Sequence, residues 1–365
     1  MDDLRDGTII GAIPSYAARP ALSLVTSLEP GALRVRQGQA TLAVLGTGRN
    51  PDGVTVLDAA PLPEREPGRR ALMAALETLF VSGRIERVRV RAGTQPGLRQ
   101  ACLAQGAALA DGAADLLVPA ELFWQRSELW LPPGPREPFP LVQVQASGFR
   151  HPLRPPKPEG LVYARFIPWL DRLLTFRTLD PAADLERFHR WMNDPRVERI
   201  WSEGGDLDQH RAYLAKLAAD PHMLPLIASL DGEPFAYFEL YWAKENRLGP
   251  HYEALDHDRG WHVLVGEDAF RGKPFVRAWL PSLMHLMFLD DPRTQRIVGE
   301  PAASHAQQIR NLERAGFAKV KHVAFPHKRA MLVMLSRERF FVDRLWAAEE
   351  DEARDGQARD GLDAS

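Results

Sequence analysis

The sequence predicts an α/β protein built from two halves, and three observations support this prediction. Strand-like and helix-like segments alternate in each half of the 365 residues, two proline-rich stretches separate the halves, and 45% of the residues are hydrophobic, which suits packed globular domains. The proline-rich stretches, residues 130–140 and 150–160, have little helix or central-strand potential. We therefore expect one domain over residues 1–160 and a second over 161–346.

The elements of the first half follow a strand, helix, strand, helix order. Residues 53–59 and 84–92 are typical of strands, and the segment between them has the spacing of an amphipathic helix. Residues 96–109 predict another helix, punctuated by Gly106.

In the second half, residues 184–197 predict a helix whose end is set by Asn193-Asp194-Pro195, and residues 206–220 predict another. Residues 224–243 have the form of two strands joined at Asp231-Gly232. A strand at 260–266 leads through a bend into a helix, a strand, a helix and a strand. The helix at 98–109 and the one at 309–320 occupy similar places, which indicates either an internal duplication or a chance likeness of two amphipathic helices.

Composition and charge restrict the function. The formal net charge of −2 gives no basic field for nucleic acid or an anionic membrane, so a small-molecule substrate is expected. One cysteine, Cys102, leaves no disulfide framework, and cysteine and histidine lack the spacing of metal ligands. The acidic start "MDDLRDGTII" is unlike a signal peptide, so we expect a cytoplasmic protein, with residues 347–365 as a flexible charged tail.

The stretch "GWHVLVGEDAFRGKPF", residues 260–275, combines a lone histidine in an apolar strand with a basic bend. At the bend, Arg271, Gly272 and Lys273 precede a helix that starts near Phe275. Backbone N–H groups, the positive helix end and two cations would converge there on an anion, and Gly272 would let the backbone approach it closely.

Several motifs in the second half resemble the siderophore-biosynthesis acyltransferases of the GNAT superfamily. They include "RWMNDPRV", the segment from "AYFELYW" to "GWHVLVG", "FRGKPF", "FLDDPRT", "GEP", "NLERAGF" and "FPHKRAMLVMLSRERFF", and they cover about residues 187–341. The resemblance implies a GNAT fold in the C-terminal half, and we expect the N-terminal half to be a degenerate GNAT-like domain. It also implies a mixed sheet splayed beside its central strand, with the pantetheine arm of the cofactor in the gap.

By this resemblance the protein would transfer an acyl group from acyl-CoA to the nitrogen of an N-hydroxylated ornithine, lysine or diamine. The acyl-CoA would be acetyl-CoA or succinyl-CoA. The product would be a hydroxamate for siderophore synthesis, made alongside other enzymes of that pathway. His262 would be the general base, since an imidazole titrates near neutral pH. The N–H groups of Val263 and Val265 and the bend from Arg271 to Phe275 would bind the cofactor.

The partner of His262 is left open by one departure from the family pattern. Relatives carry an aspartate shortly after the "EP" dipeptide, whereas here Pro301 is followed by two alanines and Ser304. Either Glu300 or Ser304 takes the polar role, or His262 acts without a carboxylate.

Residues of "YFELYW" are candidates for binding the acceptor. Tyr237, Glu239 and Tyr241 share one face of a strand, and a buried carboxylate needs a cationic partner. That partner would be an ammonium group of the acceptor or an internal arginine or lysine. Trp201 would wall the acceptor pocket, and Arg259 would meet a carboxylate of the acceptor.

Two other functions remain compatible with these residues. One is a GNAT acetyltransferase of an ordinary amine, and the other is a non-catalytic CoA-binding module.

Overall fold

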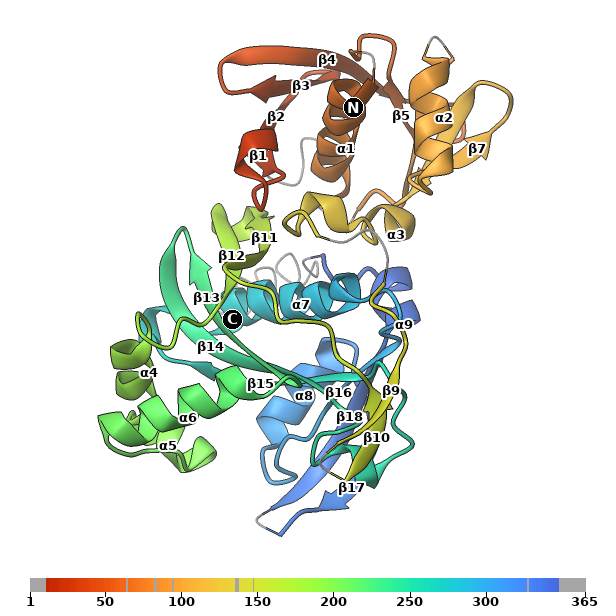
Figure 1. The fold of residues 1–365 in the computed structure, drawn as a ribbon. Helices are drawn as coiled ribbons and strands as arrows, with labels where there is room; N and C mark the ends of the chain where they lie inside the picture. The colour runs from red at the N-terminus through yellow and green to blue at the C-terminus, as the bar shows by residue number, and fades with distance from the viewer. Residues whose placement is uncertain are drawn as a thin grey trace, which may run out of the picture.

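The computed structural model describes residues 11–63, 65–81, 84–93, 95–134, 138–146, 148–326 and 328–347 (Figure 1). Within these ranges the chain forms two eight-stranded sheets, one in each half, and a two-stranded ribbon between them. Residues 348–365, which hold nearly all of the expected tail, lie outside the described residues.

The N-terminal half contains the first sheet and its helices. Its strands are β1 (Ala12–Ser15), β2 (Leu24–Glu29), β3 (Ala32–Gln37), β4 (Ala40–Arg49), β5 (Thr55–Asp58), β6 (Arg87–Arg91), β7 (Leu109–Asp111) and β8 (Asp115–Pro119). Its α-helices are α1 (Arg65–Phe80), α2 (Pro96–Ala104) and α3 (Ala120–Phe123). The expected strands β5 and β6 and helices α1 and α2 are confirmed, whereas β1 to β4 had no sequence prediction.

The C-terminal half follows the ribbon of β9 (Gln143–Ala146) and β10 (Phe149–Pro152). Its strands are β11 (Leu161–Ile167), β12 (Arg172–Thr178), β13 (Met223–Leu230), β14 (Glu233–Trp242), β15 (Arg259–Val265), β16 (Arg296–Gly299), β17 (Ala318–Ala324) and β18 (Arg329–Ser336). Its α-helices are α4 (Leu185–Met192), α5 (Pro195–Trp201), α6 (Leu207–Ala219), α7 (Lys273–Asp290), α8 (Ala306–Arg314) and α9 (Arg337–Val342). Pro195 starts α5, so the expected breaker both ends one helix and begins another.

The two sheets have the same strand order and directions. The first runs β1-β2-β3-β4-β5-β6-β8-β7 and the second β11-β12-β13-β14-β15-β16-β18-β17. In each sheet the fifth and sixth strands pair in parallel, and the other neighbours pair antiparallel. The helices also correspond, because α1, α2 and α3 occupy the places of α7, α8 and α9. The N-terminal half therefore repeats the architecture of the C-terminal half.

The sequence likeness between residues 98–109 and 309–320 falls at equivalent places in this repeat. Both segments are a helix, α2 or α8, followed by the start of the strand that ends the sheet, β7 or β17. Each helix is followed by a glycine with positive φ, 62° at Gly106 and 92° at Gly316, a conformation that closes a helix and favours glycine.

Two differences separate the halves. A short turn joins β2 to β3, whereas the equivalent strands β12 and β13 are separated by α4, α5 and α6. The parallel pair β5–β6 is in register over four residues, from Thr55 to Asp58, but β15–β16 pairs only at Arg259 and Gly260. Only the C-terminal sheet therefore opens beside its central strand.

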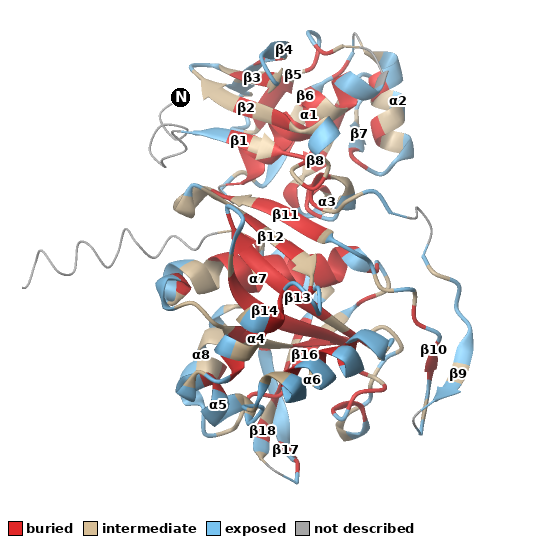
Figure 2. Cartoon of the chain, turned by 60° about the vertical axis from the view of Figure 1, so that its left-hand side comes forward, coloured by how far each residue is buried: buried red, intermediate tan, exposed pale blue. Residues whose placement is uncertain are grey.

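Buried residues concentrate in the strands and in α7, as Figure 2 shows. Helix α7 is buried at nearly every position from Ala278 to Leu289, because it packs against β11 of its own sheet and contacts the N-terminal half. None of the helices in the described ranges combines the length and apolarity needed to cross a membrane.

An aromatic cluster joins the two halves. The indole of Trp124 stacks on Trp130, with ring centroids 4.6 Å apart, and on Trp346 from the end of the C-terminal half, 5.1 Å away. Between them, His285 of α7 contacts the carbonyl oxygen of Trp124 through Nε2 at 2.6 Å and the hydroxyl of Tyr163 through Nδ1 at 2.9 Å. Burial lowers the pKa of His285 to about 3, so its ring is neutral.

The edge strands of the two sheets also meet at this junction. Strand β1 contacts β11, as their positions in Figure 1 show, and the N–H of Ala164 donates a hydrogen bond to the carbonyl oxygen of Trp130 at 2.9 Å. The halves are therefore joined by backbone as well as aromatic contacts.

This packing predicts that Trp124→Ala lowers the free energy of unfolding by roughly 3–5 kcal/mol, since a large side chain shared by both halves is lost. Urea denaturation followed by circular dichroism measures it. Leu109→Ala is the control, because Leu109 is 51% exposed on an edge strand and its loss should change stability by no more than about 0.5 kcal/mol. Equal effects of the two substitutions would contradict the proposed importance of the cluster.

Candidate active site

The site is built where β15 and β16 separate. The last pair in register is Gly260 with Val298, so the next residues on the same face of the two strands are His262 and Glu300. Gly260 is required there, because a Cβ atom would lie 2.3 Å from the ring of Tyr241 on the neighbouring strand β14. Beyond this point no strand pairing among the described residues closes the gap between β15 and β16.

His262 lies between two carboxylates. Its Nδ1 is 2.9 Å from Oε2 of Glu239 on β14, and its Nε2 is 3.3 Å from Oε1 of Glu300. The imidazole is 24% exposed, whereas the two carboxylates are 4% and 2% exposed. Since both carboxylates accept hydrogen bonds, the arrangement favours a ring that is protonated at both nitrogens.

The carboxylate of Glu239 is held from two sides. Its Oε1 accepts hydrogen bonds from the hydroxyl of Tyr213 on α6 at 2.6 Å and from Tyr237 on β14 at 2.9 Å. Its Oε2 faces His262. The cation beside Glu239 is therefore His262, which the sequence analysis did not name as its partner, and not the internal arginine or lysine considered there.

Glu300 is held by a different set of groups. Its Oε2 accepts a hydrogen bond from the hydroxyl of Tyr241 at 2.9 Å, and its Oε1 accepts one from Nη2 of Arg247 at 3.0 Å. Nη2 of Arg247 also lies 3.4 Å from Nε2 of His262. Lys328 donates to the main-chain oxygen of Glu300 at 2.8 Å, so two cations stand beside this carboxylate.

The charges of this cluster shift the pKa values of its members. Burial alone would lower the pKa of His262, but the hydrogen bonds and charges of Glu239 and Glu300 outweigh it and raise the pKa to about 9. Burial alone would raise the pKa of each carboxyl group, yet His262 holds both below their usual range, helped at Glu300 by the charges of Lys328 and Arg247. The resting site at neutral pH is thus an imidazolium between two carboxylates.

The backbone of β15 faces the gap at the residues expected to bind the cofactor. The carbonyl oxygens of Val263 and Val265 accept side-chain hydrogen bonds, from Trp201 at 3.3 Å and from Arg271 at 2.7 Å. Because the N–H and C=O of one strand residue point to the same edge, the N–H groups of Val263 and Val265 point away from β14.

The basic bend has the conformation that the sequence suggests. Gly272 has a φ of 103°, which favours glycine, and it caps α7, which begins at Lys273, two residues before Phe275. Lys273 is exposed at the first turn of this helix. The side chain of Arg271 bonds the carbonyl oxygen of Val265 and lies 3.2 Å from Asp268, so it braces the bend from within.

The structure gathers five predicted site residues in one cluster, His262, Glu300, Tyr237, Glu239 and Tyr241, and places the others around it or away from it. The ring of Trp201 lies 6.0 Å from that of His262. Phe275 packs on Phe270, outside the cluster. Arg259 is on the opposite face of β15, buried, where it pairs with Asp290 of α7 at 2.8 Å and stacks on Trp242, so it does not reach His262. Ser304 is exposed in the turn before α8, and of the two expected partners it is Glu300 that contacts the ring.

Three residues of the cluster had no site role in the sequence analysis: Tyr213, Arg247 and Lys328. They come from a helix, a loop and a turn outside the central strands. No local pattern distinguishes Tyr213 from the other apolar-face residues of α6. The only signal for Arg247 and Lys328 is that they are cations inside the stretches that carry the resemblance.

Comparisons with known proteins agree with this architecture. A family profile described as "Acetyltransferase (GNAT) domain" matches residues 180–325. N(6)-hydroxylysine O-acetyltransferase of Escherichia coli is 44% identical over 60% of this chain and 70% of its own length. The N(5)-hydroxyornithine:cis-anhydromevalonyl coenzyme A-N(5)-transacylase of Beauveria bassiana is 49% identical over 52% of this chain and 43% of its own length.

A hydroxyornithine transacylase of Ajellomyces capsulatus is 46% identical over 53% of this chain and 45% of its own length. The chain thus spans less than half the length of these two fungal relatives, but more than two thirds of the bacterial one. With this coverage and identity, the chain belongs to the GNAT acyltransferase family that includes the hydroxylysine and hydroxyornithine acyltransferases.

Proposed function

We propose that this protein transfers an acyl group from acyl-CoA to the nitrogen of an N-hydroxylated amine, giving a hydroxamate that can chelate ferric iron. The observation that carries the proposal is the position of His262, with its two carboxylates, at the point where β15 and β16 separate. An acyl thioester lying along the open edge of β15 would place its carbonyl carbon beside this histidine. The names of the relatives specify hydroxylysine and hydroxyornithine as acceptors, which supports an N-hydroxylated amine as substrate. Transfer to nitrogen is supported by the name of the Beauveria bassiana relative, an N(5)-transacylase, whereas the Escherichia coli relative is named an O-acetyltransferase.

Acyl-CoA is the donor that fits the gap and the bend. The N–H groups of Val263 and Val265 would hold the pantetheine arm and the developing oxyanion. The exposed N-terminus of α7, with Gly272 and Lys273, would take the pyrophosphate. The Beauveria bassiana relative is named for a coenzyme A thioester, which supports this class of donor.

The proton balance favours a hydroxylamine over an ordinary amine as acceptor. An alkylamine is charged at neutral pH and must lose a proton before it attacks, whereas the electron-withdrawing oxygen leaves a hydroxylamine nitrogen largely neutral. With a pKa of about 9, only about one His262 ring in a hundred is neutral at pH 7. A site whose base is mostly protonated suits the acceptor that needs the fewest protons removed.

The transfer would then proceed in balanced steps. The hydroxylamine nitrogen attacks the thioester carbon, and His262 takes the proton that the nitrogen loses from the tetrahedral adduct. The C–S bond breaks, and the leaving thiolate takes that proton from His262. Glu239 stabilises the imidazolium through Nδ1, because its carboxylate is held by Tyr213 and Tyr237.

This assignment predicts the pH dependence of kcat/KM. Since His262 acts as a base only when neutral, kcat/KM should rise with pH, with an inflection near pH 9 and a plateau above it. Removing either negative charge, by Glu239→Gln or Glu300→Gln, destabilises the imidazolium and should move the inflection down toward about 6.5. A profile that is unchanged in both variants would be inconsistent with a base held between these carboxylates.

Separate defects are expected for the chemical and cofactor-binding residues. His262→Ala should lower kcat roughly 10²- to 10⁴-fold while CoA affinity, measured by calorimetry, is kept. Lys273→Ala should weaken CoA binding roughly tenfold with little change in kcat. Lys321→Ala, an exposed lysine of β17, is the matched control and should leave both unchanged. If Lys273→Ala binds CoA like the unaltered protein, the phosphate site lies elsewhere.

The acceptor is identified by a substrate panel. CoA release is measured with acetyl-CoA and succinyl-CoA against N-hydroxyornithine, N-hydroxylysine, N-hydroxycadaverine, N-hydroxyputrescine and each parent amine. We expect strong preference for a hydroxylated acceptor, and a product that gives the coloured ferric complex of a hydroxamate.

The other outcomes separate the alternatives. Equal use of the parent amines would indicate a general amine acetyltransferase, and CoA binding without turnover a non-catalytic module. An acylated product without the ferric colour would indicate transfer to the hydroxyl oxygen instead of the nitrogen.

A further inference from the structure

The segment that connects the two halves is bound to the C-terminal half by a buried ion pair. Residues 149–157, which are β10 and the five residues after it, run along the side of that half; we call this segment the strap (Figure 1). The guanidinium of Arg154 in the strap donates two hydrogen bonds to Glu245, each 2.5 Å long. The side chains are only 2% and 4% exposed, so this is a fully desolvated, bidentate pair.

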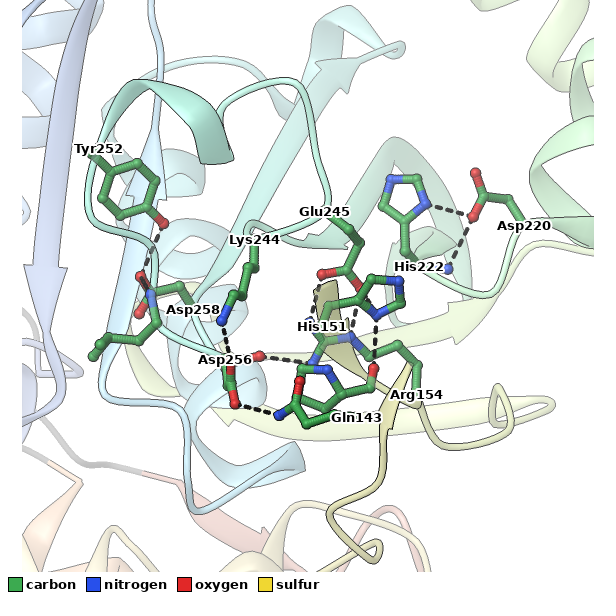
Figure 3. A network of polar contacts seen from close by, with 12 residues as sticks. Gln143, His151, Arg154, Asp220, His222, Lys244, Glu245, Tyr252, Asp256 and Asp258 are labelled. Atoms are coloured by element: carbon green, nitrogen blue, oxygen red, sulfur yellow. Dashed lines mark hydrogen bonds and ion pairs between the residues drawn. The ribbon is translucent and has the colours of Figure 1, made fainter. Parts of the chain in front are cut away.

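The partner of the strap is the loop between β14 and β15, residues 243–258, which we call the site loop. Figure 3 shows Arg154 between Glu245 at one end of this loop and Asp256 at the other. Arg154 also donates to the main-chain oxygen of Asp256 at 2.8 Å, and Gln143 of β9 donates to the Asp256 side chain at 2.9 Å. One arginine therefore fixes both ends of the site loop.

Further contacts bind the strap to the C-terminal half. The guanidinium of Arg154 lies over the ring of Trp242, 4.3 Å from its centroid. His151 of β10 lies 3.6 Å from Glu245, and Lys157 donates to the carbonyl oxygen of Leu217 at 2.6 Å. Leu217 is on α6, the helix that supplies Tyr213 to the cluster around His262.

The site loop carries one member of that cluster. Arg247 lies two residues after Glu245, and its Nη2 contacts both Glu300 and His262. The side chain of Arg247 is 47% exposed, so packing around the side chain alone does not fix its direction. Its position depends on the course of the loop backbone, which a salt bridge between Lys244 and Asp256 also braces.

We propose that Arg154 is a positioning residue: by clamping the site loop, it holds Arg247 beside Glu300 and His262 and so tunes the acyl-transfer site from the connection between the two halves. The inference rests on the proposed function where it is tested by kcat/KM, but not where it is tested by the pKa of His262 measured by NMR. The groups that face the His262 ring are Glu239 and Tyr241 from β14, Glu300 after β16, Arg247 from the site loop and Trp201 from α5.

The test is a double-mutant cycle between Arg154 and Arg247. Arg154→Met removes the clamp, and Arg154→Lys keeps the charge opposite Glu245 while losing the bidentate geometry, which protects the test if the methionine variant does not fold. Each is made alone and with Arg247→Ala. Arg150→Met, an exposed arginine of β10, is the matched control. Thermal melts establish that each variant is folded.

Two readouts distinguish positioning from general stability. The first is the pKa of His262 by NMR, with its resonance assigned by loss in His262→Ala. The Arg154 variants should raise the pKa of His262, because a cation beside the imidazolium is displaced. In protein that already carries Arg247→Ala, the Arg154 substitutions should leave this pKa unchanged. The second is kcat/KM, which should fall roughly 10- to 100-fold in otherwise unaltered protein and show no further loss with Arg247→Ala.

The outcomes separate this inference from the proposed function. An unchanged pKa of His262 in folded Arg154 variants, or losses that add fully to those of Arg247→Ala, would overturn the positioning role. Absence of turnover in the unaltered protein, with the pKa shift present, would overturn the proposed reaction and leave the clamp supported.

Discussion

The site depends on the early end of the pairing between β15 and β16. After Gly260 and Val298 the two strands diverge, which leaves the N–H groups of Val263 and Val265 without a strand partner and places His262 and Glu300 at the vertex. A fully paired sheet would use the same N–H groups for its own ladder, as the equivalent strands β5 and β6 do. The two halves share one architecture, and this local difference in strand pairing distinguishes their central strands.

Charge balance follows from that geometry. Two buried carboxylates would repel each other and lose hydration if they stood alone, so the histidine between them is held in its charged form. Three phenols and one guanidinium, those of Tyr213, Tyr237, Tyr241 and Arg247, donate further hydrogen bonds to the carboxylates. The ring is therefore oriented before a substrate arrives, which lowers the reorganisation needed during proton transfer.

Much of this arrangement can be predicted from the sequence, because period and turn chemistry are local. The alternation of β14 places Tyr237, Glu239 and Tyr241 on one face, and the bend before α7 needs its glycine. The same alternation separates Arg259 from His262, which lie three residues apart and so on opposite faces. To predict that Glu300 and not Ser304 contacts His262, one must know the angle at which β15 and β16 diverge. To predict the role of Tyr213, one must know how α6 packs on the sheet. Neither is a local property of the sequence.

The contact between β1 and β11 has a consequence for the solubility of the chain. Both are edge strands, and an exposed edge presents unpaired backbone groups on which another chain can add a strand. Here each half covers an edge strand of the other. The carbonyl oxygen of Trp130 accepts a hydrogen bond from the N–H of Ala164 on β11. A C-terminal half released from the N-terminal half would expose this edge of β11 to strand addition by another chain, so the N-terminal half protects it from aggregation through the edge that it covers.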